Sequence, residues 1–127
     1  MSSDAVPMDL VGAIDIVEET YEFMLAYAAQ GRVNDTDASD TSIRAHLGRA
    51  DRALGVIAAA KLPGAAGEKF LEVVRHDAAK AGAAIGLVLA RSSLSSQMID
   101  NLNASIHLRA LLTDIFLLDE TLELNAS

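Results

Sequence analysis

Apolar residues recur along most of the chain at intervals of three and four positions, the spacing that places them on one face of an α-helix. Strict alternation of apolar and polar residues, which indicates a strand, does not occur. The pattern predicts an all-α fold with helices over about 7–30, 42–62, 65–91 and 94–124. We expect these four helices to form one up-and-down bundle, with residues 1–127 as a single domain.

The fourth predicted helix, 94–124, is apolar on two sides. Its first stripe includes Leu94, Leu112 and Phe116, and its charged member is Arg109. A second stripe lies opposite, with the three-and-four spacing of a coiled-coil seam, and consists of Leu108, Leu111, Ile115, Leu118 and Leu122. A helix in a monomeric bundle buries one stripe, so we expect the second stripe to be covered by another protein chain.

Burial of the second stripe favours self-association, most simply as a two-fold homodimer. Five large aliphatic residues contribute roughly 8–15 kcal/mol per chain when fully buried, whereas association costs about 4–15 kcal/mol. The first predicted helix has a wide apolar arc that includes Ile16, Phe23 and Tyr27, and we expect it to join the interface. Two alternatives are an unknown protein partner on the same seam, and a fourth helix that lies between neighbours of its own chain.

Composition and charge narrow the functional classes. The 127-residue chain has no cysteine and a net charge of −8, which excludes thiolate chemistry and disfavours a nucleic-acid partner. No segment has the length of a membrane span or the pattern of a signal peptide, so we expect a cytoplasmic protein without membrane contact. Residues 1–40 carry a net charge of −8, 41–91 of +4 and 92–127 of −4, which favours acidic helices beside basic ones.

Four polar residues are candidates for ligand binding or a buried ion pair. Arg109 falls within an apolar stripe, and a buried guanidinium needs a partner, for which Glu18 is the candidate. His46 and His107 lie at the edges of apolar stripes, where a helical bundle can hold a metal or a small ligand. The spacing of Glu and His residues does not match that of carboxylate-bridged metal sites, so we predict no metal and no cofactor.

A short segment around the first histidine resembles the phosphoacceptor motif of histidine phosphotransfer domains, which are also small four-helix bundles. The segment is Ala45-His46-Leu47-Gly48-Arg49, with Leu54-Gly55 downstream. The family's pattern is His, any residue, Leu, Lys, Gly. Here the leucine follows His46 directly and an arginine follows the glycine, so the family's lysine has no counterpart. The resemblance implies phosphoryl transfer through His46.

The sequence contains no serine-based nucleophile motif and no phosphate-binding loop. We therefore expect a non-enzymatic interaction or scaffolding protein that acts through self-association or partner binding by its fourth and first helices. The alternative is a bundle that binds a small ligand or a metal, and histidine phosphotransfer is a further one. A dry core favours the interaction protein, whereas a pocket that holds His46, His107 or Arg109 beside Glu18 favours the ligand-binding bundle.

Overall fold

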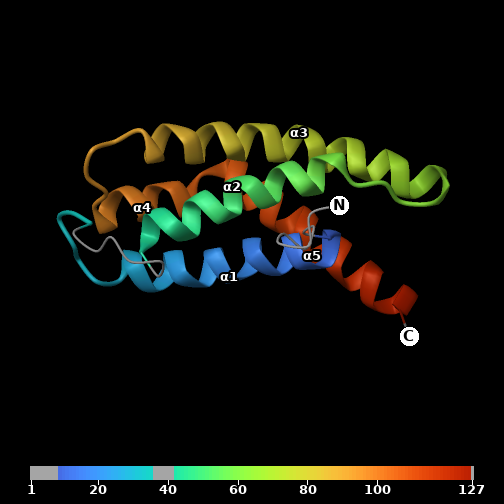
Figure 1. Cartoon of the computed structure of the whole chain (residues 1–127), viewed down its shortest axis with the longest axis horizontal. Helices are drawn as coiled ribbons and strands as arrows, with labels where there is room; N and C mark the ends of the chain where they lie inside the picture. The colour runs from blue at the N-terminus through green and yellow to red at the C-terminus, as the bar shows by residue number, and fades with distance from the viewer. Residues whose placement is uncertain (1–8, 36–41, 127) are drawn as a thin grey trace, which may run out of the picture.

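The computed structural model describes residues 9–35 and 42–126, with side chains up to residue 121 (Figure 1). Within these residues the chain is all-helical, with five helices and no strand. The helices are α1 (Leu10–Ala28), α2 (Ile43–Ala59), α3 (Gly64–Leu89), α4 (Ser96–Ala104) and α5 (Ile106–Ala126). Over the described residues, none of these helices combines the length and the apolar character needed to cross a bilayer.

Short polar side chains cap the first two helices. The Asp9 carboxylate accepts a 2.7 Å hydrogen bond from the backbone N–H of Gly12 at the start of α1. The Ser42 hydroxyl accepts one of 3.1 Å from the N–H of Ala45 at the start of α2. These bonds satisfy N–H groups that have no partner within the helix. Gly31 follows α1 with a φ of +66°, a left-handed conformation that glycine adopts without strain.

The predicted fourth helix is interrupted at Ser105, so it forms α4 and α5 instead of one element. Ser105 has extended backbone, with a ψ of 141°. Its hydroxyl accepts a 3.2 Å hydrogen bond from the N–H of Leu108, which caps α5. The prediction of one continuous helix over 94–124 is wrong, because the cap at Ser105 replaces a helical residue and resets the direction in which α5 side chains point.

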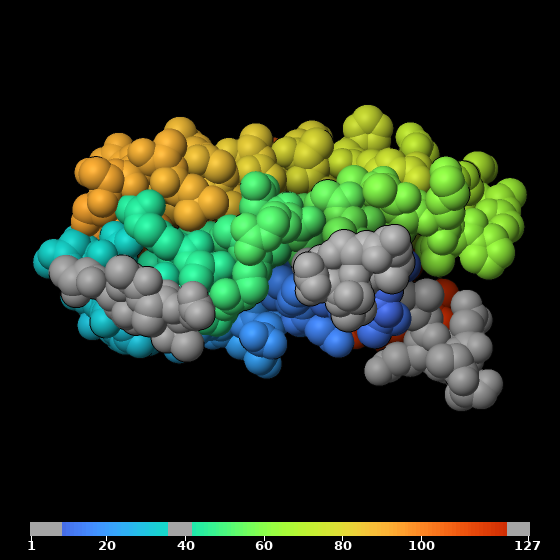
Figure 2. Space-filling view, viewed as in Figure 1, coloured from blue at the N-terminus to red at the C-terminus, as the bar shows by residue number. Residues whose placement is uncertain are grey.

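The helices pack in a closed arrangement. α1 contacts α2, α2 contacts α3, α3 contacts α5, and α1 also contacts α4 and α5. Figure 1 shows α1, α2 and α3 side by side, with the last turns of α5 extending past α1. In the space-filling view of Figure 2, α2 (green) lies on the surface between α1 (blue) and α3 (yellow). Thus α5 has neighbours of its own chain on two sides.

The core between the helices is almost entirely aliphatic. All five helices and the loop before α4 contribute residues with no exposed surface. These are Ala13, Ile14, Leu47, Ala53, Ile57, Leu71, Val74, Ala81, Leu94, Ile99, Leu111 and Ile115. Burial of such side chains is the main source of stability in a fold of this size.

A polar network ties the loops together at one end of the molecule. The Tyr27 hydroxyl donates a 2.7 Å hydrogen bond to the Leu94 carbonyl, and the Ser96 hydroxyl donates one of 2.7 Å to the Tyr27 carbonyl. The Asp35 carboxylate accepts hydrogen bonds from the Leu94 N–H at 2.6 Å and from Arg44 Nε at 2.5 Å. Burial raises the pKa of Asp35, but these bonds and the Arg44 charge outweigh burial and leave the pKa below its ordinary value.

Candidate functional site

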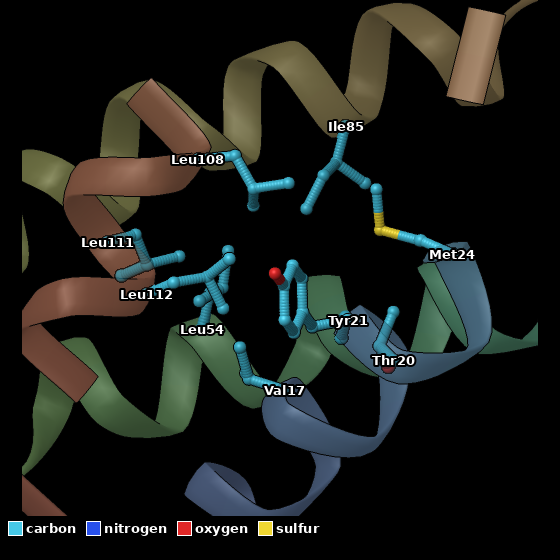
Figure 3. Close-up of a pocket in the computed structure, with 10 residues that line it drawn as sticks. Val17, Thr20, Tyr21, Met24, Leu54, Ile85, Leu108, Leu111 and Leu112 are labelled. Atoms are coloured by element: carbon cyan, nitrogen blue, oxygen red, sulfur yellow. The ribbon is translucent and has the colours of Figure 1, made fainter. Parts of the chain in front are cut away.

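The leucine stripe expected to face another chain lies inside this one. Figure 3 shows Leu108 and Leu111 of α5 pointing into the pocket that they line together with Val17 of α1 and Ile85 of α3. The described members of the stripe are all buried, and they are Leu108, Leu111, Ile115 and Leu118. The outward placement of the stripe is wrong because the break at Ser105 turns it toward the core. The structure fits the alternative prediction, in which the last helix lies between neighbouring helices of its own chain. The side chain of Leu122 lies outside the described residues.

The three interface residues predicted on α1 also serve the chain's own packing. Ile16 is half-buried against the core. Phe23 stacks on the ring of His46 in α2, with centroids 3.7 Å apart and planes 13° from parallel. Tyr27 is buried, with its hydroxyl bonded to the Leu94 carbonyl. Tyr27 is therefore covered by its own chain, whereas Ile16 and Phe23 keep partial exposure and their place in an interface stays a prediction.

A small apolar cavity lies between α1, α2, α3 and α5 (Figure 3). Its volume is about 10 Å³, at the lower limit of the ~10–15 Å³ that one water requires. The hydroxyl of Thr20, which lines the cavity, already donates a 2.7 Å hydrogen bond to the Ile16 carbonyl. The cavity is therefore too small for a metabolite and offers little polar contact to a water.

His46 is a packed core residue of α2. Its Nδ1 lies 2.9 Å from the Ser42 carbonyl, and its ring faces Phe23. Only 8% of the residue is exposed. A phosphoacceptor histidine must be reached by a donor protein, so this environment does not provide the surface that the phosphotransfer resemblance requires.

The other candidate ligand residues lie on α5 and α1. Arg109 and His107 are exposed on α5, and Glu18 is half-buried on α1. The prediction that Arg109 is buried is wrong, because the turn of α5 after Ser105 brings it to the surface. Among the described residues, no three His, Asp or Glu side chains are grouped as metal ligands would be.

A carboxyl pair joins α3 to α5 and was not anticipated from the sequence. Burial raises the pKa of Asp114, and the hydrogen bond and negative charge of Asp77 raise it further, to about 7. Asp114 Oδ2 is buried and has no N–H or O–H partner among the described residues. Two adjacent carboxylates repel each other, so the pair is stable when it holds one proton.

One face of α5 remains open to solvent. It consists of Arg109, Thr113, Phe116 and Glu120, which are all exposed, and we call it the α5 outer face. The spacing of four, three and four residues places these side chains within one narrow arc of the helix. Leu117 adjoins this face. Phe116 is 47% exposed and Leu117 is 56% exposed, so two large apolar side chains lie next to each other in water.

Tyr21 of α1 borders the α5 outer face. Its ring meets that of Phe116 edge-to-face, with centroids 6.5 Å apart and an angle of 70°. Together with Arg109, Leu112 and Thr113, the two rings line a surface groove of about 80 Å³. The Thr113 hydroxyl donates a 2.9 Å hydrogen bond to the Arg109 carbonyl, so its polar group is satisfied within the helix. Aromatic and arginine side chains of this kind are enriched at protein interfaces.

The exposure of Phe116 was missed because the sequence pattern placed it in a buried stripe. The local signal that could have corrected this is the segment 103–105, Asn-Ala-Ser, in the middle of the predicted helix. Asparagine and serine favour helix ends over helix interiors. A break at that point changes the phase of α5, so the second stripe is buried and Phe116 of the first stripe is exposed, while Leu112 stays buried.

Comparisons of the sequence and the structure with known proteins give no relative. No family model, no curated protein and no solved structure matches the chain. The functional interpretation therefore depends on the geometry of the described residues.

Proposed function

We propose that this protein is a non-enzymatic association module that self-associates through the α5 outer face and the adjoining part of α1. In this proposal, α4 and α5 together act as the interrupted fourth helix of an up-and-down bundle that presents the face. The observation that carries the proposal is the exposure of Phe116 and Leu117 side by side on a helix whose opposite stripe already fills the core.

The surface chemistry of this face supports binding to protein. Covering the exposed halves of Phe116 and Leu117 would contribute about 1 kcal/mol for each residue. Contact with Tyr21 restricts the Phe116 ring before a partner arrives, which lowers the entropy lost on binding. The flanking charges of Arg109 and Glu120 supply a polar rim around the apolar centre.

The interior supports binding over catalysis. The cavity between the helices has a volume of only about 10 Å³. His46 is packed in the core, and His107 is exposed on α5. These placements leave the outer surface as the part of the described structure where chemistry with a partner can occur.

Sedimentation equilibrium of purified protein tests the proposal at about 100 μM, where a micromolar complex is mostly assembled. We expect the wild-type chain to associate and the double variant Phe116→Lys, Leu117→Lys to be a helical monomer. The matched control is Leu87→Lys on α3, a residue 73% exposed, which should associate like the wild type. A wild-type chain that stays monomeric, or a double variant that associates unchanged, contradicts the proposal.

A further inference from the structure

The α5 outer face has opposite charges at its two ends. Arg109 lies eleven residues before Glu120, and both are exposed. At 1.5 Å of rise per residue, the two charges are about 16 Å apart along the helix axis. Between them, Thr113 lies four residues after Arg109, and Phe116 lies four residues before Glu120. The face is therefore complementary to a reversed copy of itself.

We propose that the partner of this face is a second copy of the same chain, with the two α5 helices packed antiparallel about a two-fold axis. In this register Arg109 faces Glu120 of the second copy, and Thr113 faces its Phe116. The inference rests on the proposed function of the α5 outer face and adds the antiparallel register of the contact.

Charge complementarity selects this arrangement over the alternatives. Two-fold symmetry makes each contact occur twice, so the pair gains two ion pairs at the rim and two contacts between Phe116 and Thr113. A parallel pair would set Arg109 against Arg109 and Glu120 against Glu120, which is repulsive. The Thr113 hydroxyl is already bonded to the Arg109 carbonyl, so covering it leaves no new unsatisfied donor.

Charge-reversal variants test the register, with the dissociation constant measured by sedimentation equilibrium. Arg109→Glu and Glu120→Arg should each weaken association by about tenfold or more, because each sets like charges together twice. The double variant R109E/E120R restores both ion pairs. An equimolar mixture of the two single variants restores them between different chains. We expect both to return within about threefold of the wild-type affinity.

Two variants away from the face serve as controls for net charge. Lys69→Glu on α3 changes the net charge as Arg109→Glu does, and Asp100→Arg on α4 changes it as Glu120→Arg does. Both positions are exposed, and neither substitution should change the dissociation constant. Because Arg109 and Glu120 are also exposed, we expect every variant to keep the wild-type circular dichroism and melting temperature.

The outcomes separate the register from the proposed function. Association that survives both single reversals, or that the mixture fails to restore, overturns the antiparallel register. If Phe116→Lys, Leu117→Lys still abolishes that association, the proposed function stands without the register. An equimolar mixture of wild type and Arg109→Glu that associates more strongly than the wild type alone would indicate parallel pairing, in which Arg109 of one copy meets the introduced glutamate of the other, and would also overturn the register. A wild-type monomer contradicts both proposals.

Discussion

At the scale of single residues, the two tyrosines of α1 have different roles although they are six positions apart on one helix. Tyr27 is buried, and its hydroxyl closes the polar network on the Leu94 carbonyl at 2.7 Å. Tyr21 is half-buried, and its ring borders Phe116 at the surface. The residue type is the same at both positions. The neighbouring elements therefore decide whether the hydroxyl forms a hydrogen bond in the core or the ring packs at the surface.

Removal of the Tyr27 hydroxyl should therefore destabilise the protein. Tyr27→Phe leaves the Leu94 carbonyl without its short hydrogen bond, and we expect a loss of about 1–2 kcal/mol in the free energy of unfolding. Urea denaturation monitored by circular dichroism measures this loss. Tyr21→Phe is the matched control and should change the free energy by less than about 0.5 kcal/mol. Equal effects of the two substitutions would disprove the role of the buried hydroxyl.

At the scale of elements, the boundary between α4 and α5 determines which side of α5 enters the core. The Ser105 hydroxyl accepts the Leu108 N–H, and the extended backbone at Ser105 separates the helical phase of α4 from that of α5. As a result Leu111 and Ile115 are fully buried, whereas Ile106 is 76% exposed. A single capped residue thus brings the second stripe into the core and divides the first, of which Leu112 stays buried and Phe116 is exposed.

Loss of this cap should be measurable. Ser105→Ala removes the acceptor for the Leu108 N–H, and we expect a loss of about 1 kcal/mol in the free energy of unfolding. Ser105→Asp retains an acceptor at the same position and should remain within about 0.5 kcal/mol of the wild type. Thermal or urea melts of the three proteins make the comparison. An alanine variant as stable as the aspartate variant would show that the cap does not stabilise α5.

At the scale of the whole molecule, α5 closes the arrangement by packing on α3, and the Asp77–Asp114 pair lies in that contact. The folded state raises the pKa of Asp114 from 3.8 to about 7. A carboxyl group with a raised pKa in the folded state adds stability below its unfolded pKa, and this stability is lost as the pH rises through the folded value. The contribution of this pair therefore falls between about pH 4 and pH 7.

Substitution of Asp114 should alter the pH dependence of stability. Asp114→Asn keeps a hydrogen bond to Asp77 and removes the second charge, so the melting temperature of the variant relative to the wild type should rise as the pH increases from about 4 to about 7. Melting temperatures at several pH values test this. Asp100→Asn on the exposed surface of α4 is the control, and its melting temperature should show the same pH dependence as that of the wild type. A constant difference between Asp114→Asn and wild type across this range would contradict the shared proton.

The helical class and the apolar residues of the core follow from local spacing along the chain. Helix periodicity needs only neighbouring residues, so the all-helical fold was predictable. The inference that water does not surround the second stripe of the last helix was also correct, because large aliphatic side chains gain free energy by burial. Its described members, Leu108, Leu111, Ile115 and Leu118, are covered, although by their own chain.

The identity of the covering surface and the composition of the candidate site depend on contacts between residues far apart in the sequence. Apolar side chains attract any apolar surface without direction, so periodicity cannot distinguish α1 and α3 from a second chain as the cover of Leu111 and Ile115. The pairing of Asp77 with Asp114, and of Tyr21 with Phe116, arises only when three helices pack. Helix phase after Ser105 then decides which side chains of α5 remain at the surface.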